Sequence, residues 1–260
     1  MIVRLELKFE VKNNVLPKDN KRIWVSFLKN VLSNCAEGKY YDRYYNGTSP
    51  KDFSFSIVLP HPKFVGEKIE LDSNTVRMIF SASDKGNTGL IFYSAFLEAK
   101  NKSFPLPSGN SMTLKAVRYQ KEQSIQSNSA VFRTVVGGGL VVREHDAQTN
   151  KDKFYTSEED GFIDAMYRVI KNELLYAKFP EYLMNDVSVN VISFKKVLVK
   201  QYGVYVDANV GVFQVNAHPE ILQYLYQAGM GSKRSMGYGL LDVVNTEEWK
   251  GGGLCDYKAR

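Results

Sequence analysis

One segment near the C-terminal end of the sequence combines glycines with side chains that bind phosphate. Residues 229–239 read GMGSKRSMGYG, with Lys233 and Arg234 flanked by two serines. Glycine permits positive φ angles and lets backbone N–H groups approach a ligand, Lys and Arg neutralise phosphate oxygens, and Ser donates hydrogen bonds. The sequence therefore predicts a phosphodiester contact made by Gly229, Gly231, Ser232, Lys233, Arg234, Ser235, Gly237 and Gly239.

The position of this glycine segment excludes two common phosphate-binding loops. A dinucleotide fingerprint follows a strand and opens a helix, and a P-loop ends in Gly-Lys-Ser/Thr before a helix. Here the segment follows a predicted helix that starts at Pro219 and leads into a predicted strand over 240–244. The alternative that needs no ligand is a helix C-cap followed by a tight turn.

A second segment, residues 39–52, reads KYYDRYYNGTSPKD and is predicted to be a basic loop rich in tyrosine. Tyrosine rings can stack on bases while Lys39, Arg43 and Lys51 pair with phosphates. The alternative is that the tyrosines cover the edge of a hydrophobic core, with their hydroxyls in water. Both interpretations stay open from the residues alone.

The first half of the chain shows the periodicity of strands and helices in a recognisable order. Residues 2–11 alternate as a strand, residues 21–38 carry an apolar helical stripe, strands follow at 53–57 and 76–82, a helix at 88–99 and a strand at 112–119. This β-α-β-β-α-β order predicts a ferredoxin-like domain, in which two helices cover one face of four antiparallel strands and leave the other face free.

The second half repeats the order after a polar linker at 121–129. Residues 131–143 are extended, a helix is expected at 157–177 with a capping box formed by Thr156 and Glu159, valine-rich strands run from 187 to 212, and a helix runs from Pro219 to Gly229. The predicted fold is α+β, with two tandem ferredoxin-like domains with antiparallel sheets, at 1–122 and 129–245, and a flexible tail at 246–260.

Composition limits the class of protein. The 260 residues carry 34 Lys and Arg against 28 Asp and Glu, a net charge of +6, and are 44% hydrophobic, which is typical of a globular chain with a mild preference for anionic partners. No apolar run reaches the roughly 20 residues of a membrane helix, and the N-terminus does not resemble a signal peptide, so a cytoplasmic location without membrane contact is expected. Only Cys35 and Cys255 are present, so neither a disulfide framework nor a cysteine-rich zinc site is expected.

The glycine segment, with apolar Met230 and Tyr238 between its paired glycines, resembles the loop G-h-G-x5-G-h-G of CRISPR repeat-processing endoribonucleases in the repeat-associated mysterious protein (RAMP) superfamily. Weaker resemblance extends to residues 49–56, SPKDFSFS, and to residues 140–146, LVVREHD. The resemblance implies two ferredoxin-like domains, CRISPR repeat RNA as partner and no metal or other cofactor. It also implies that a ribose 2′-OH attacks the scissile phosphate and leaves a 2′,3′-cyclic phosphate and a 5′-OH.

This reaction needs a base for the 2′-OH proton, an acid for the leaving oxygen and a cation for the phosphorane. Members of the superfamily place a histidine at or behind the first helix, whereas this sequence has no histidine between residues 2 and 60. Lys51 matches the position of the family's catalytic lysine, and Tyr45 or Asn46 falls near the position of the missing histidine. The catalytic candidates are therefore Lys51, Tyr45, Tyr41 and His145, and Arg143, Lys39 and Arg43 join the glycine segment as expected RNA contacts.

The incomplete catalytic set leaves two possibilities for an RNA-binding protein. It either cuts slowly, or it holds its RNA without cutting as a subunit of a CRISPR interference complex. In both cases it is expected to be a monomer or a homodimer. A third hypothesis is a tandem ferredoxin-like protein that binds a small anionic ligand; steep salt dependence of RNA binding would separate it from the RNA hypotheses. Among the other histidines, His61 is expected in a turn and His218 at a helix N-cap.

Overall fold

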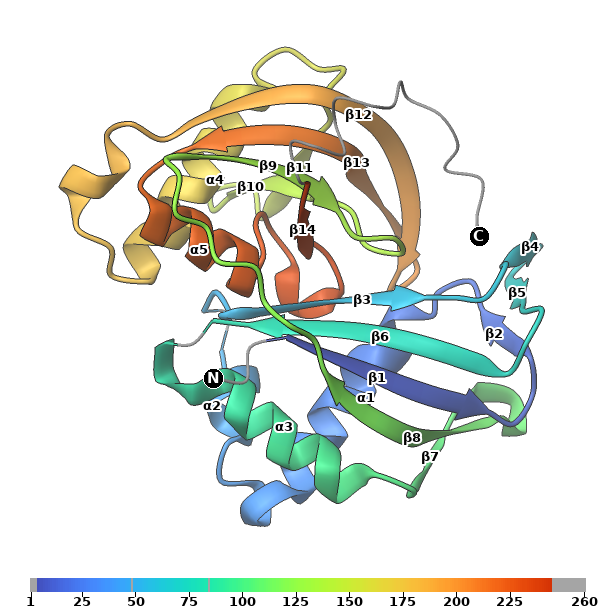
Figure 1. Cartoon of the computed structure of the whole chain (residues 1–260). Coiled ribbons are helices and arrows are strands. Elements are labelled where there is room, and N and C mark those ends of the chain that lie inside the picture. Colours follow the sequence, from blue (N-terminus) through green and yellow to red (C-terminus); the bar gives the residue numbers. More distant parts are fainter. Residues whose placement is uncertain (1–3, 48, 84, 245–260) are drawn as a thin grey trace.

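The computed structural model describes residues 4–47, 49–83 and 85–244. These residues form two α+β domains with antiparallel sheets, the first half of the chain below the second in Figure 1. The predicted fold class is confirmed, since in each domain the first strand lies between the third and fourth of the β-α-β-β-α-β order. The predicted tail at 246–260 lies outside the described residues.

The N-terminal domain is a five-stranded sheet with two helices on its lower face in Figure 1. Its strand order is β3 (Phe53–Val58), β6 (Thr75–Ala82), β1 (Arg4–Val11), β8 (Ser111–Tyr119) and β7 (Ser103–Pro105), and its helices are α1 (Lys21–Asn34) and α3 (Thr88–Ala99). A small sheet of β2 (Val15–Pro17), β5 (Lys68–Glu70) and β4 (Lys63–Val65) flanks it. Apolar side chains facing the helices form the core; for example, the Phe92 ring of α3 lies 4.8 Å from Phe53 and 4.7 Å from Phe80 between centroids.

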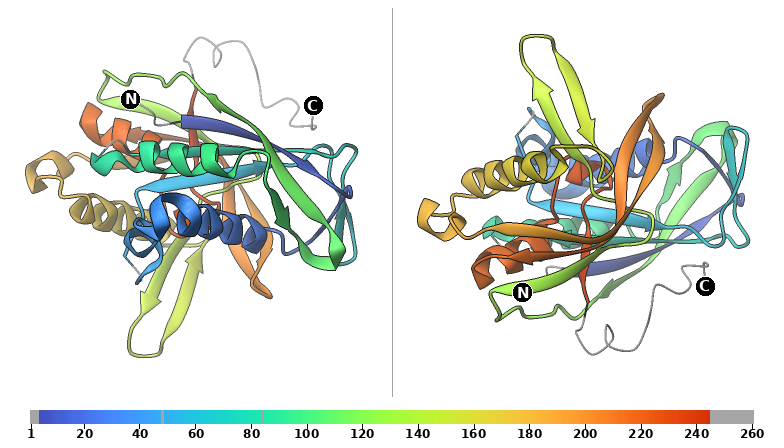
Figure 2. Two further views of the ribbon diagram at one scale, coloured as in Figure 1. Left: turned by 90° about the horizontal axis from the view of Figure 1, so that it is seen from below. Right: turned by 90° about the horizontal axis from the view of Figure 1, so that it is seen from above.

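The C-terminal domain is a four-stranded sheet in the order β12 (Ser188–Gln201), β13 (Val204–Asn216), β9 (Ser129–Thr134) and β14 (Leu241–Val243), with helices α4 (Phe162–Tyr176) and α5 (Pro219–Ala228). A hairpin of β10 (Val142–Asp146) and β11 (Lys151–Tyr155) is inserted between β9 and α4. In Figure 2 this yellow-green hairpin extends well beyond the sheet. Residues 120–126 join the two domains without helix or strand.

The upper face of the N-terminal sheet, expected to be free, is covered by the C-terminal domain. The Ser56 hydroxyl donates to the carbonyl of Val136 at 2.6 Å, and the Ser81 hydroxyl donates to the carbonyl of Gln227 at 2.7 Å. The alternation of Phe and Ser in β3 explains this arrangement, because the phenylalanines fill the core below and the small serines let the second domain's backbone come close. A Cβ on Gly137 would lie only 1.8 Å from the carbonyl oxygen of Ile57.

Three local expectations differ from the structure. The second-domain helix starts at Phe162, not at residue 157, because residues 157–161 form turns and Gly161 at φ 80° precedes the helix. The predicted capping box is therefore wrong: the Thr156 hydroxyl donates to the Glu159 carboxylate within that turn at 3.0 Å. The tyrosine-rich segment contains a short helix, α2 (Tyr41–Tyr45), after a tight turn at Cys35–Gly38.

Among the described residues, no helix combines the length and apolar character required to cross a membrane.

Candidate nucleic-acid interface

The glycine loop, residues 229–239, is held by its own backbone. Gly229, Gly231, Gly237 and Gly239 all have φ between 73° and 90°. The amides of Met230 and Gly239 donate to Gly239 and Gly139 carbonyls at 2.9 and 2.7 Å, and the Ser232 amide donates to Val141 at 2.7 Å. These three N–H groups thus stabilise the loop itself, and the expectation that loop amides approach a ligand fails for them.

Replacing Gly239 by Ala is expected to lower the free energy of unfolding by well over 1 kcal/mol, because the new Cβ would lie 2.2 Å from the Met230 carbonyl oxygen at a φ of 73°. Chemical denaturation measures the effect. The matched control is Gly161→Ala, where φ is 80° but nothing lies within 4 Å of the added Cβ. Equal losses in the two variants would show that the close approach at Gly239 does not matter.

Helix α1 of the N-terminal domain anchors the glycine loop. The Lys21 ammonium donates to the carbonyls of Gly237 at 2.5 Å and Gly137 at 3.2 Å, and lies 4.3 Å from the Tyr238 ring centroid. Lys21 is only 5% exposed, and its burial lowers the Lys21 pKa to about 7. The first turn of α1 therefore fixes the loop between the two domains.

A buried ion pair supports the loop from the other side. Arg234 is 5% exposed; its guanidinium donates to the Gly229 carbonyl at 3.0 Å and lies 3.7 Å from the Glu173 carboxylate of α4. Burial raises the Glu173 pKa to about 7, although Arg234 and the Gly231 amide oppose the shift. Arg234 thus supports the loop from inside, and its guanidinium is not available for the direct phosphate contact that the sequence predicted.

A cleft of about 500 Å³ opens between the two domains beside the loop. Five cationic residues from both domains line it: Lys29 and Lys51 from the first, and Arg143, Lys233 and the buried Arg234 from the second. Of the predicted site residues it gathers Tyr45, Lys51, Arg143, Gly231, Ser232, Lys233, Arg234 and Ser235. Aliphatic and aromatic side chains, including Val25, Tyr44, Val169 and Met236, form the rest of its wall.

The two first-domain catalytic candidates in the cleft differ in what they can do with a proton. Partial burial lowers the pKa of Lys51, which favours proton donation compared with an exposed lysine. The Tyr45 hydroxyl is buried with no hydrogen-bond partner among the described residues, and burial raises the Tyr45 pKa far above its ordinary value. Tyr45 can therefore donate a hydrogen bond at neutral pH but cannot serve as a base.

Several predicted site residues lie outside the cleft lining. Tyr41 contacts the outside of Tyr45, with ring centroids 5.7 Å apart, and Lys39 lies over the Tyr40 ring. Arg43 faces Thr88, whose hydroxyl is 3.4 Å from the guanidinium. At Gly229, Gly237 and Gly239, other protein atoms already lie close to the position that a Cβ would take. The tyrosine-rich segment thus serves mainly as a core edge, with Tyr44 buried in the core itself, and Tyr44 and Tyr45 also border the cleft.

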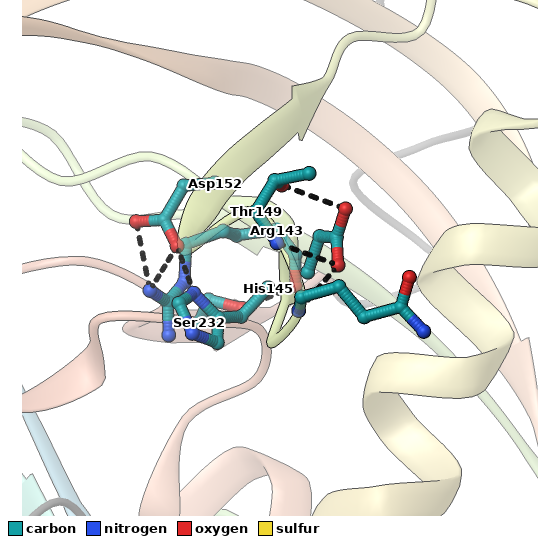
Figure 3. Close-up of polar contacts among 7 residues, drawn as sticks. Arg143, His145, Thr149, Asp152 and Ser232 are labelled. Carbon is teal, nitrogen blue, oxygen red and sulfur yellow. Dashed lines mark hydrogen bonds and ion pairs between the residues drawn. The ribbon is translucent and has the colours of Figure 1, made fainter.

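His145 lies on the hairpin, in a neighbouring groove that shares Arg143 with the cleft. Its Nδ1 atom is 2.9 Å from an Asp152 carboxylate oxygen, and Arg143 contacts the same carboxylate at 2.8 Å (Figure 3). The other two histidines have local roles: His61 lies 3.6 Å from Asp72, and the His218 side chain accepts from the Glu220 amide at the start of α5, as expected for an N-cap.

The lining residues that were not predicted include Lys29, Glu173 and Tyr202. Glu173 had a signal in the sequence, since it interrupts the apolar stripe formed by Met166, Ile170 and Leu174 on the buried face of α4. No sequence pattern pointed to Tyr202, because the fold of the β12–β13 turn brings it to the cleft. In that turn the amides of Tyr202 and Gly203 donate to the carboxylate of Asp19 in the first domain.

No group of three or more His, Cys, Asp or Glu side chains that could hold a metal ion occurs in the part of the chain that the structure describes.

Comparisons with known proteins agree with this arrangement. Residues 120–243 match the family model described as CRISPR associated protein Cas6, C-terminal. No curated protein matches the chain by sequence. Among solved structures, the product of a Cas6-related gene from Pyrococcus furiosus matches with a TM-score of 0.77 and 20% identity, covering 94% of this chain and 98% of that one.

Two further solved structures show the same fold. A RAMP protein binding different RNA substrates has a TM-score of 0.74 and 21% identity, covering 94% of this chain and 100% of that one. A Cas6 product complex has a TM-score of 0.66 and 16% identity over 94% and 100% of the two chains. The C-terminal domain thus matches the Cas6 C-terminal family model on a chain with the fold of Cas6 and RAMP proteins, which confirms the resemblance drawn from the glycine loop.

Proposed function

We propose that the protein binds the repeat of CRISPR precursor RNA in the interdomain cleft and cleaves it by attack of a ribose 2′-OH, leaving a 2′,3′-cyclic phosphate and a 5′-OH. The cleft itself carries this proposal. Both domains supply cations to its lining, and the one carboxylate that lines it among the described residues, Glu173, is buried beside Arg234. Such a surface attracts a polyanionic backbone and supplies the positive charge that a phosphorane needs.

We assign the residues of the cleft the following roles in this reaction. Lys51 and Lys233 stabilise the negative charge that develops on the phosphate, and their lowered pKa values favour proton transfer to the leaving oxygen. Tyr45 borders the cleft with its ring, because its hydroxyl is buried. Ser232 and Ser235 line the same cleft and can hold neighbouring oxygens.

The matched solved structures add support by analogy. One is a Cas6 product complex and another is a RAMP protein binding different RNA substrates. A product complex and RNA binding are thus known for proteins that share this fold, and the cleft described above gives this chain a surface suited to RNA.

Incubating the purified protein with a labelled repeat RNA in excess EDTA tests the proposal. The expected result is one cut that leaves a 2′,3′-cyclic phosphate. An RNA with a single 2′-deoxy residue upstream of the cut should bind equally and remain intact, since it lacks the nucleophile. Cleavage of the 2′-deoxy RNA, or absence of any RNA binding, would contradict the proposal.

The second candidate is an RNA-binding subunit that retains the repeat without cutting it. Two observations favour it: residues 2–60 contain no histidine, and Tyr45 cannot act as a base. Tight binding with intact RNA in the same experiment would support this candidate, and complex subunits would then be its further partners.

A further inference from the structure

The β10–β11 hairpin holds a histidine and a carboxylate in the arrangement of an oriented general base. His145 on β10 and Asp152 on β11 are paired across the hairpin, and His145 Nδ1 lies 2.9 Å from Asp152 Oδ1. The imidazole is 45% exposed. Asp152 lies between His145 and Arg143, whose guanidinium is 2.8 Å from both carboxylate oxygens (Figure 3).

This geometry determines which ring nitrogen carries the proton. Arg143 and His145 hold the Asp152 pKa below its ordinary value, against the effect of desolvation, so the carboxylate is ionised at neutral pH. An ionised carboxylate only accepts hydrogen bonds, so His145 donates through Nδ1–H. The lone pair of Nε2 is then free to take a proton, as in a base oriented by a third group.

The histidine is also connected to the glycine loop. The Ser232 hydroxyl of that loop donates to the Arg143 carbonyl at 3.4 Å, and the Lys233 charge is close enough to lower the Asp152 pKa. The groove containing His145 shares Arg143, Val169 and Asn172 with the cleft. The groove therefore adjoins the part of the cleft that Arg143 and Lys233 line.

The other charged groups facing this groove leave it suited to RNA. Lys151, Lys153 and Arg168 line it with Arg143. Its two remaining carboxylates are engaged, Glu144 by Arg168 and Tyr155, and Asp146 by the hydroxyl of Thr149. Lysines and arginines thus outnumber acidic groups around His145.

We infer that His145, oriented by Asp152, is the general base of the reaction proposed above and replaces the histidine that the first domain lacks. This inference rests on the proposed function. The Nε2 atom takes the proton of the 2′-OH, the O2′–P bond forms as the P–O5′ bond breaks, and the Lys233 ammonium gives a proton to the departing O5′. Proton exchange with water returns imidazolium and amine to their starting forms. Asp152 acts through His145 and is a positioning residue.

Single-turnover cleavage of the repeat RNA in EDTA tests the inference with H145A and D152N. H145A is expected to cut about 10²- to 10⁴-fold more slowly with unchanged RNA affinity, since a positioned base contributes that factor. D152N should lose less of the cleavage rate than H145A does. The ascending limb of the pH–rate profile should differ between D152N and the wild type. Long-range ¹H–¹⁵N spectra should show the Nδ1–H tautomer of His145 in the wild type and a mixture of tautomers in D152N.

The matched control is H61A, because His61 is also an exposed histidine beside an aspartate, 3.6 Å from Asp72, but lies outside both the groove and the cleft. H61A should cut at the wild-type rate. Normal cleavage by H145A alongside an active wild type would overturn the inference and leave the proposed function standing. An inactive wild type that binds RNA would overturn both.

Discussion

Arg234→Ala is expected to lower the free energy of unfolding by about 3–5 kcal/mol at pH 8, because it leaves the Glu173 carboxylate buried without its cation. Arg234 and Glu173 are 5% and 6% exposed, and the guanidinium also holds the Gly229 carbonyl. Denaturant unfolding followed by circular dichroism measures the loss. A loss under 1 kcal/mol would show that the pair is not a support of the glycine loop.

The effect of Arg234→Ala should depend on pH in a defined direction. The folded-state Glu173 pKa, about 7, lies above its ordinary value of 4.5, so its contribution to stability is present below about pH 4.5 and is lost as pH rises through 7. Removing Arg234 raises that pKa further, so the variant should be destabilised less at pH 5 than at pH 8. Adding E173Q should recover part of the loss at pH 8.

An exposed ion pair provides the control for this prediction. Arg77 lies 3.4 Å from Glu6 and is 49% exposed. Arg77→Ala should cost no more than about 1 kcal/mol at either pH, since exposed pairs contribute little.

The double variant Lys29→Ala with Lys233→Ala is expected to weaken repeat-RNA binding by about 100-fold or more at low salt, since each charged hydrogen bond contributes roughly 1.5–3 kcal/mol. The two lysines line the cleft from opposite domains. If each contacts a phosphate, the slope of log affinity against log salt should become shallower by about 2. Fluorescence anisotropy at several salt concentrations measures both quantities.

A charge-matched control separates local contacts from overall attraction. Lys100→Ala with Lys102→Ala removes the same two charges from the exposed turn after α3, outside the cleft lining. This control should bind RNA almost as well as the wild type. Equal weakening in the two double variants would show that net charge, and not the cleft, determines the affinity.

The domain architecture could be predicted because its signals are local. Alternation in residues 2–11 and the apolar stripe of α1 give the type of each element, and helix α3 was predicted with its observed bounds, Thr88–Ala99. The β10–β11 hairpin was not predicted, because its polar residues 142–155 carry no apolar alternation. Its strands are specified by pairing with each other and by contact with the glycine loop.

The candidate site was predictable only in part, because it depends on contacts between residues that are far apart in the sequence. The sequence indicated that residues 229–239 would approach an anion, but it could not separate the two cations there: Lys233 lines the cleft, whereas Arg234 is buried against Glu173, 61 residues earlier in the chain.

By itself the sequence determined the β-α-β-β-α-β order of the main elements, the two-domain fold and the position of the glycine loop, since each follows from the spacing of neighbouring residues. The tertiary structure alone decided which side chains meet. Lys51 and Lys233 share a cleft, and His145 faces Asp152, because packing of the second domain on the first sheet and closure of the hairpin bring distant residues together.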